Sequence, residues 1–349
     1  MMILRWDKWG AQVLIHSGLL AGIERSEARQ ENVLRILAYH RIGDPADDRQ
    51  RGDPSLFSVS AEGFSAQMAY LAEHYHAISP TEMLAALGGS HRLPPRSVLI
   101  TFDDAYHDFL DLAWPVLQRL QLPAVLFVAT DYVGGSQIYW WDRLHQALAR
   151  TECCELRLPD GSYWQLSGEA ARHRALKAIG RRLKHMEHGA AMALIGQIVD
   201  RLAVKIDSSG LILNWDEVRQ MRDGGLYVGA HTASHPILSR VSTEQARREI
   251  VQSQQAVQEE LGQSWPIFCY PVGHPPDLRA DLVTVLREEG FQAAVTMIEG
   301  HNIVGQSEPL RLRRVAVAPH ITLDEFRLIL TRAYDLYGAV AQVGPRDWK

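Results

Sequence analysis

Cysteine and long apolar runs are both scarce in this chain of 349 residues. There are three cysteines, Cys153, Cys154 and Cys269. A vicinal pair plus one isolated residue argues against a disulfide framework and makes a poor zinc set, so we expect buried or half-buried thiols and a reducing compartment. No run of about 18 apolar residues occurs, so we expect no transmembrane helix.

An excess of basic residues is also missing. The 36 lysines and arginines are outnumbered by 41 aspartates and glutamates, which gives a formal net charge of −5. Nucleic-acid-binding proteins usually carry a strongly basic surface, so we expect no nucleic-acid partner. The length fits one large domain with insertions or two domains, and nothing in it defines an oligomeric state.

The N-terminal segment lacks the features of a signal peptide. Its apolar run is broken by Gln12, His16 and Ser17, and no small-residue cleavage site follows. Residues 6–24 are spaced for an amphipathic helix, which would either pack on the domain or contact a membrane surface. We therefore expect a cytoplasmic protein, with peripheral membrane contact through this helix as an option.

Strand-like and helix-like segments alternate along most of the chain. The helix expected at residues 80–87 has Ser79 as N-cap, Pro80 at its first position and Glu82 at its third. This alternation, with about eight strands, predicts an α/β fold that forms a (β/α) barrel. Strand-like runs occur at 33–39, 98–102, 124–128, 226–230, 267–270, 291–295 and 313–317.

One long segment interrupts the alternation and carries a strand-like piece, a turn and a basic helical stretch. We interpret it as an α+β insertion or lid that shapes substrate access. The expected organisation is an N-terminal helical extension at 1–32, a barrel at 33–135 and 214–335, the insertion at 136–213 and a tail at 336–349.

Polar side chains follow several of the expected strands. Asp103, Asp104, His231 and Tyr270 all fall at predicted strand ends. Active sites of such barrels lie at the C-terminal ends of the strands, so these residues are candidates for one site.

Two carboxylates and two histidines in these positions suggest a metal site. His231 and His235 are four residues apart, and Pro236 after them favours a tight loop over a helix. A carboxylate with two histidines is a common open zinc site, and the metal lowers the pKa of a bound water. We favour Asp104 as ligand and Asp103 as general base. The alternative is a pair of hydrogen-bonded polar loops without metal.

These motifs resemble those of a known family. The runs at 101–104 (TFDD) and 231–236 (HTASHP) are similar to the first two motifs of the NodB-like polysaccharide deacetylases, carbohydrate esterase family four. The runs at 268–273 (FCYPVG) and 39–41 (YHR) resemble one branch of that family, often found in exopolysaccharide gene clusters. The likeness covers about residues 33–135 and 214–330.

The resemblance implies a distorted barrel of the NodB-homology type that removes N-acetyl groups from a glycan and releases acetate. It places a divalent metal ion, zinc first, on Asp104, His231 and His235, with Asp103 as base. The metal and a backbone amide within residues 270–272 would hold the oxyanion.

Two positions depart from the family pattern. Ala105 stands where the family usually has glycine, and Cys269 stands near the place of an arginine that many members carry. Orientation of Asp103 could then fall to Arg313 or Arg314 near the last strand, and Arg313 is our candidate.

The remaining site candidates each have a plainer alternative. The resemblance implies a late histidine as general acid, for which His320 is the candidate, against a solvated loop residue. His40, Tyr270, Pro271 and Trp141 are candidates for substrate contact, against packing or hydrogen bonding under the barrel rim.

Two other functions stay open. A hydrolase of the same fold could act on a small amide, for which a closed small pocket would be evidence, whereas an open cleft beside the insertion would favour a glycan. A non-catalytic carbohydrate-binding relative would keep the fold without the chemistry.

Overall fold

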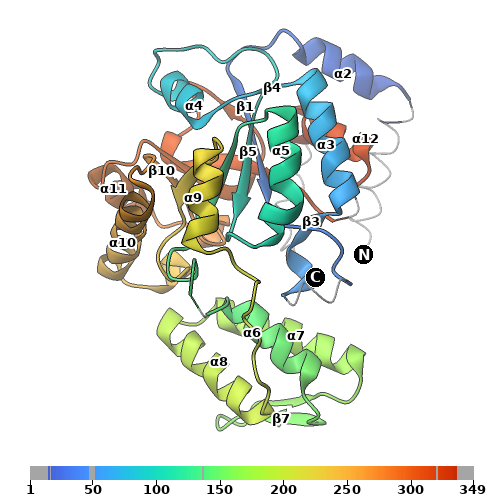
Figure 1. The fold of residues 1–349 in the computed structure, drawn as a ribbon, viewed down its shortest axis with the longest axis vertical. Helices are drawn as coiled ribbons and strands as arrows, with labels where there is room; N and C mark the ends of the chain where they lie inside the picture. The colour runs from blue at the N-terminus through green and yellow to red at the C-terminus, as the bar shows by residue number, and fades with distance from the viewer. Residues whose placement is uncertain (1–14, 16, 47–51, 136, 320, 336–349) are drawn as a thin grey trace.

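The computed structural model describes residues 15–335 apart from 16, 47–51, 136 and 320. A barrel surrounded by helices forms the larger part, and a smaller lobe lies beyond one end of it (Figure 1). The helix expected at residues 6–24 is described only in part, within α2 (Leu19–Glu27), and the expected tail lies outside the described residues. Peripheral membrane contact therefore stays a prediction. No helix of the described part combines the length and the apolar character needed to cross a bilayer.

Seven parallel strands close into the barrel. The ring is completed by β5 against β1, which pair from Leu34–Ser97 to Tyr39–Phe102. The sequence prediction of about eight strands therefore counts one too many, although all seven strand-like runs belong to the ring. In order, the ring contains β1 (Val33–Tyr39), β13 (Leu312–Ala316), β11 (Ala293–Glu299), β10 (Ile267–Cys269), β9 (Tyr227–Ala230), β6 (Ala124–Val128) and β5 (Ser97–Asp103).

Alternation along the strands determines which side chains face the barrel interior. On β5, Val98, Ile100 and Phe102 join the core beneath the surrounding helices, whereas Leu99 joins a second core inside the barrel. Successive side chains of a strand point to opposite faces, so Asp103 at the end of β5 points inward like Leu99.

Helices and two short strands surround the barrel. The predicted capping box of α4 is present, because Ser79 and Glu82 each accept a hydrogen bond from the other's backbone. The elements are α3 (Ala61–His74), β4 (His76–Ala77), α4 (Pro80–Leu87), α5 (Trp114–Leu120), α9 (Trp215–Asp223), α10 (Thr243–Leu261), α11 (Ala280–Glu288), β12 (Asn302–Ile303) and α12 (Leu323–Ile329).

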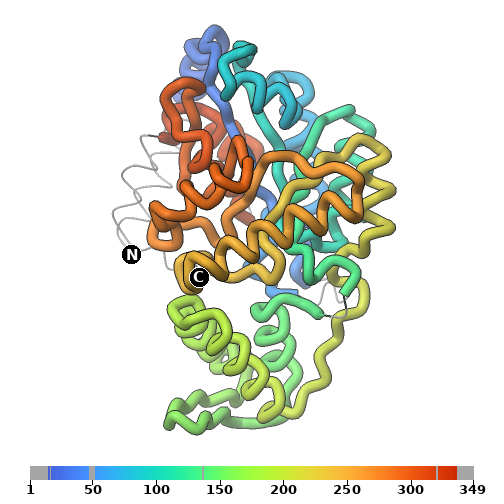
Figure 2. The backbone as a smooth tube through the Cα atoms, turned by 90° about the vertical axis from the view of Figure 1, so that its left-hand side faces the viewer, coloured from blue at the N-terminus to red at the C-terminus, as the bar shows by residue number. Residues whose placement is uncertain are grey.

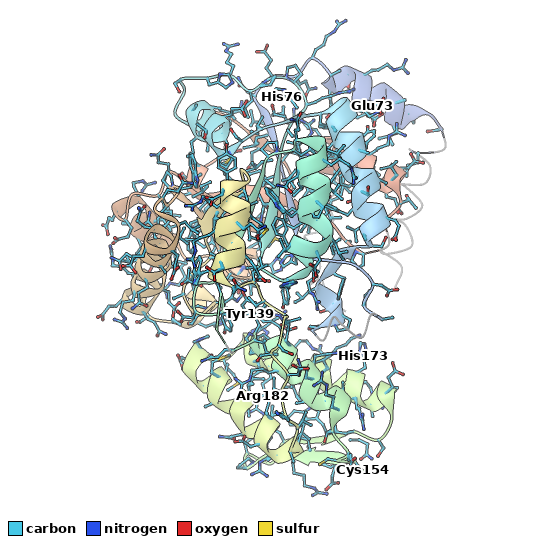
Figure 3. The ribbon with its side chains drawn as sticks, in the orientation of Figure 1. Glu73, His76, Tyr139, Cys154, His173 and Arg182 are labelled. Atoms are coloured by element: carbon cyan, nitrogen blue, oxygen red, sulfur yellow. The ribbon has the colours of Figure 1, made fainter. Side chains whose placement is uncertain are left out.

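The smaller lobe has a hydrophobic core of its own. Leu144, Ile179, Ile195 and Ile198 are buried in it together. Figure 2 shows that two chain passages join the lobe to the barrel, and Tyr139 lies at the junction (Figure 3). The domain boundaries inferred from the sequence stay predictions. The lobe contains α6 (Trp140–Arg150), β7 (Glu155–Arg157), β8 (Tyr163–Gln165), α7 (Glu169–Lys184) and α8 (His188–Leu202).

Candidate metal centre and active site

Three side chains from two strand ends converge at one mouth of the barrel. Asp104 follows β5, and His231 follows β9 with His235 four residues later. The Oδ1 atom of Asp104 lies 3.6 Å from Nε2 of His231 and 3.4 Å from Nε2 of His235. The two Nε2 atoms are 3.2 Å apart. All three side chains are buried, so one oxygen and two nitrogen atoms that could bind a metal surround one small volume.

The backbone that carries these groups is strained. Asp104, Ala105, Thr232 and His235 have φ angles of 75°, 52°, 66° and 55°. Residues with a Cβ reach this left-handed region at a cost of roughly 1–2 kcal/mol each. Ala105 therefore adopts a conformation that glycine would reach more easily, which accounts for the glycine that is usual here in the family it resembles.

The carboxylate of Glu249 on α10 holds the loop that carries His235. It accepts hydrogen bonds from the backbone N–H groups of Ala233 (3.1 Å) and Ser234 (2.8 Å) and from the Ser234 hydroxyl (2.7 Å). Glu249 is itself buried. Its three hydrogen bonds offset part of the strain at Thr232 and His235.

The three converging ligand atoms suit a divalent cation. Oδ1 of Asp104 is buried and has no hydrogen-bond partner, which is costly unless a cation faces it. Nδ1 of His231 lies 2.8 Å from the carbonyl oxygen of Cys269, so Nδ1 donates and the lone pair of Nε2 faces Asp104. An oxygen and two imidazole nitrogens form a ligand set suited to zinc.

The pKa shifts agree with this fit. Burial raises the pKa of Asp104 well above its ordinary value, and the charges of Asp103 and Asp142 raise it further. Burial lowers the pKa of His231 to about 4 and that of His235 well below its usual range. Both imidazoles are therefore neutral ligands at pH 7, and the buried Asp104 carboxylate requires a positive charge.

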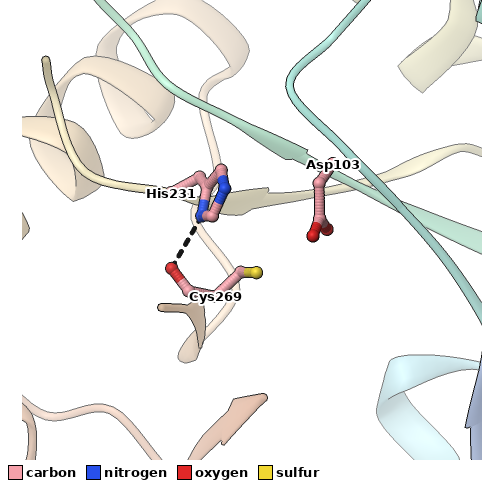
Figure 4. A group of neighbouring side chains, drawn as sticks. All are labelled: Asp103, His231 and Cys269. Carbon is pink, nitrogen blue, oxygen red and sulfur yellow. Dashed lines mark hydrogen bonds between the residues drawn. The ribbon is translucent and has the colours of Figure 1, made fainter. Parts of the chain in front are cut away.

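Asp103, His231 and Cys269 form a second group of potential ligands (Figure 4), which shares His231 with the first. It fits a metal less well. Cys269 Sγ accepts a hydrogen bond from Arg314 at 3.3 Å, and burial raises the thiol pKa well above its ordinary value, so the sulfur stays protonated. Asp103 is already paired with Arg314, so we take Asp104 with the two histidines as the candidate centre.

Asp103 forms a buried bidentate ion pair with Arg314. Its two carboxylate oxygens accept from the guanidinium at 2.8 and 2.7 Å. Burial alone would raise the pKa of Asp103, but the charge and hydrogen bonds of Arg314 outweigh it and hold this pKa well below the usual range. Adjacent carboxylates therefore differ: Asp103 is paired and ionised, whereas the Oδ1 atom of Asp104 has no partner.

The choice of Arg313 as the partner of Asp103 is wrong. On β13, Leu312 packs inside the barrel, so Arg314, two residues later, also points inward. Arg313 points to the other face and is exposed. The two-residue period of a strand decides between the neighbours.

The other predicted residues have mixed outcomes. Nε2 of half-buried His40 lies 3.8 Å from Oδ2 of Asp103, so His40 belongs to the site. Tyr270 is buried and its hydroxyl donates to the carbonyl of Leu310, which favours the packing alternative, and its assignment as a substrate contact stays a prediction. Pro271 is buried, with its carbonyl accepting from the N–H of Gly273. His320 lies outside the described residues.

The first residues of α6 and the one before it bring the lobe against the candidate metal centre. The ring of half-buried Trp141 lies 5.0 Å from the His235 ring, edge to face, and stacks on Tyr139 at 4.4 Å. The Tyr139 hydroxyl donates to the carbonyl oxygen of Asp104 at 2.9 Å. Trp141 thus lies beside His235, and its role as a substrate contact stays a prediction; Tyr139, which was not a sequence candidate, lies there as well. The cluster of aromatic residues at a helix start was its only signal.

A buried chain of hydrogen bonds continues from Trp141. Its indole N–H donates to the hydroxyl of Tyr106 at 2.7 Å, and that hydroxyl donates to Asp142 at 2.7 Å. Asp142 also accepts from the backbone N–H of Asp53. Burial raises the pKa of Asp142 to about 7. These hydrogen bonds fix the position of Trp141 beside His235. Neither Tyr106 nor Asp142 was a candidate from the sequence.

Known proteins share both the sequence pattern and the fold. The family model for polysaccharide deacetylases matches residues 90–154 and 160–294, which is more than half of the chain. The poly-beta-1,6-N-acetyl-D-glucosamine N-deacetylase of Escherichia coli (strain K12) is 33% identical over 112 residues, 31% of this chain and 16% of the relative. Its Staphylococcus epidermidis namesake is 28% identical over 137 residues, 37% of this chain and 47% of the relative. The chain thus spans less than half the length of these two relatives.

Solved structures show the same fold. The Streptococcus pyogenes deacetylase PplD, determined in complex with acetate, has a TM-score of 0.57 and 20% identity, covering 87% of this chain and 99% of that one. IcaB from Ammonifex degensii has a TM-score of 0.52 and 18% identity, covering 86% of this chain and 96% of that one. At this identity the likeness concerns the fold, a barrel of the NodB-homology type. The family match rests on the sequence itself, and by that match the chain belongs to the polysaccharide deacetylase family.

Proposed function

We propose that this protein is a metal-dependent hydrolase that removes N-acetyl groups from a polysaccharide or glycan intermediate and releases acetate. One observation carries the proposal. Asp103 and Asp104 are adjacent at a strand end and buried, yet one is neutralised by Arg314 and the other faces two imidazoles with an unpaired oxygen. Purely structural packing gains nothing from such a costly arrangement.

A divalent cation, zinc first, held by Asp104, His231 and His235 would act as a Lewis acid and lower the pKa of a water molecule. Asp103 then serves as the general base. Its low pKa keeps it ionised at neutral pH, and each oxygen bonded to Arg314 retains a further acceptor position. Arg314 fixes the orientation of this carboxylate, because it also donates to Thr101 and to the carbonyl of Thr296.

The oxyanion of the tetrahedral intermediate needs a hydrogen-bond donor close to the metal ligands. Within the expected segment, the N–H of Tyr270 already donates to the carbonyl of Val295, and Pro271 has no N–H. The amide of Val272 is the remaining candidate. Val272 has a φ of 61° and lines the same cleft as His235, which supports this assignment.

The leaving amine requires a proton. His320 stays the first candidate for the general acid, as the resemblance implies. His40 is the second, because it lies 3.8 Å from Asp103. Burial lowers the pKa of His40, so this imidazole is neutral at rest and would have to receive a proton from Asp103 before donating it.

The substrate class follows from the named relatives and from the form of the site. The E. coli and S. epidermidis relatives are named for poly-beta-1,6-N-acetyl-D-glucosamine, a polymer of N-acetyl sugars. A cleft beside His235 runs between the lobe and the barrel. This cleft lies beside the insertion and is partly open to solvent, which favours a glycan over a small amide.

Metal content and acetate release together test the proposal. We expect about one divalent ion per chain in the purified protein, and acetate release from N-acetylglucosamine oligomers. His231→Ala should lose both, whereas the exposed His173→Ala on α7 should lose neither. Folded protein that takes up no metal after supplementation would refute the mechanism and favour the carbohydrate-binding alternative. Metal uptake with acetate release only from small amides would favour the other alternative.

A further inference from the structure

The cleft between the lobe and the barrel begins at the candidate metal centre. His235 and Val272 line it on the barrel side, and Trp140, Met186 and Met192 line it on the lobe side. Trp140 and both methionines are half-buried. Apolar and aromatic side chains of this kind pack against the flat faces of sugar rings. A glycan held at the metal centre would therefore pass along the edge of this cleft, which is itself too narrow for a sugar ring.

The charged side chains that line the cleft are basic. Lys184 at the end of α7 lies on the lobe side and Arg240 on the barrel side, with His188 beside them, and no carboxylate of the described residues lines the cleft. Arg240 donates to the backbone carbonyl oxygen of Lys184 at 3.2 Å, which ties the barrel side of the cleft to the end of α7. Asp277 lies within electrostatic range of both residues and offsets part of their charge.

Helix α7, which leads to the cleft, is basic as well. Residues 169–188 contain six arginines and lysines and two glutamates, in a chain whose net charge is −5. The usual explanation of such a run is a solvated helix face. Here the run ends at Lys184, in the cleft that touches a candidate metal ligand, so its field acts where the substrate would lie.

We propose that the substrate is anionic, with a negatively charged group next to the acetylated sugar, bound by Lys184 and Arg240. This inference rests on the proposed deacetylation and narrows its substrate. The poly-N-acetylglucosamine named for the relatives is uncharged at its acetylated sugars, so this cleft would distinguish the chain from them. A carboxylate and a phosphate are two sources of the same charge.

Three substrates test the inference on the metal-loaded protein: a neutral β-1,6-linked N-acetylglucosamine tetramer, a hyaluronan tetrasaccharide with alternating glucuronic acid, and UDP-N-acetylglucosamine. Acetate release gives kcat/KM, and calorimetry gives Kd. We expect at least one anionic substrate to exceed the neutral tetramer by about tenfold at low salt and to lose this advantage as salt rises. Hyaluronan and the nucleotide sugar distinguish carboxylate from phosphate.

Variants separate this role from general effects of charge. Lys184→Glu should remove the preference, measured as the ratio of kcat/KM for the anionic substrate to that for the neutral tetramer, and Lys184→Arg should keep this ratio. Lys205→Glu makes the same charge change on an exposed lobe residue outside the cleft and should change nothing.

Two failures can be told apart. Equal or better turnover of the neutral tetramer, or equal effects of Lys184→Glu and Lys205→Glu, would overturn the anionic substrate and leave deacetylation standing. No acetate from any of the three, with metal bound and anionic glycans still binding through Lys184, would overturn deacetylation instead.

Discussion

The barrel mouth and the lobe place their charged residues differently: the mouth buries them, whereas the lobe leaves most of them at its surface. At the mouth, Asp103, Asp104 and Arg314 are buried, and the backbone beside the ligands lies in the left-handed region. In the lobe, Ile195 and its neighbours form an ordinary apolar core, and most charged side chains lie at the surface. The costly groups are concentrated where chemistry needs fixed geometry, on rigid strand ends.

The lobe contributes to the site through one helix start and one cleft wall. Tyr139 and Trp141 pack against His235, and Lys184 lines the cleft. Chemistry and substrate choice are thus expected to reside in different regions. Substitutions at the mouth should change turnover or metal binding, and those in the lobe should change stability of the lobe or the choice of substrate.

The largest effect should come from Asp103→Asn. The amide keeps the shape of the side chain but cannot accept a proton, so we expect kcat to fall by about 10² to 10⁴. Metal content should stay at the wild-type value, because Asp103 is not among the candidate ligands. Asp111→Asn, at an exposed position on the segment before α5, is the control. A near-normal kcat would show that Asp103 is not the base.

Arg314→Met should cost the most stability, about 3–5 kcal/mol, because Asp103 would be left buried without its partner. Arg313→Met is the matched control one residue away. It removes an exposed guanidinium and should change the free energy of unfolding by less than about 0.5 kcal/mol. Urea denaturation measures both. Equal effects would contradict the inward position of Arg314.

Ile195→Ala tests whether the lobe is independent of the mouth. Ile195 is fully buried in the lobe core, and its truncation should cost about 2–5 kcal/mol. If the two regions are separate, the thermal unfolding transition of the lobe should move to lower temperature, while metal content per chain stays unchanged. The exposed Ala193→Ser on the same helix serves as control. Loss of metal in Ile195→Ala would show that the mouth depends on the lobe.

Asp104→Asn should raise the stability of the metal-free protein, whereas Arg314→Met and Ile195→Ala should lower stability. It removes a buried carboxylate whose Oδ1 atom has no partner, so we expect a gain of about 1–3 kcal/mol in the free energy of unfolding. The same variant should lose the stabilisation that added zinc gives the wild type. Thermal unfolding with and without zinc measures both. A destabilised metal-free variant would mean that Asp104 has a structural partner instead.

The sequence predicted the barrel well because strands and helices leave local signals. The capping residues Ser79 and Glu82 and the runs of buried apolar residues define elements independently of tertiary contacts. Asp104, His231 and His235 could also be found, because strand ends meet at one face of a barrel. Arg314 could have been chosen over Arg313 from strand alternation with Leu312. Tyr139 and Glu249 could not have been identified from the sequence, because their roles depend on where the lobe and α10 lie in space.

The smallest expected effect is the change of stability with pH. It distinguishes the carboxylate ligand at the mouth from the histidine ligands. Because burial lowers the pKa of His231 to about 4, the unfolded chain binds more protons than the folded one between about pH 4 and 6.5, so the stability of metal-free protein falls as pH falls through this window. Asp104 acts with the opposite sign, since its raised pKa lets the folded state take up a proton as pH falls. The two terms partly cancel, and we expect a net change on the order of 1 kcal/mol in the wild type. In Asp104→Asn the Asp104 term is absent and no longer offsets the histidine term, so stability should fall more steeply than in the wild type from pH 6.5 to 4. Identical slopes in urea titrations of the two proteins would mean that the Asp104 carboxyl does not titrate against the histidines as its buried, unpaired position requires.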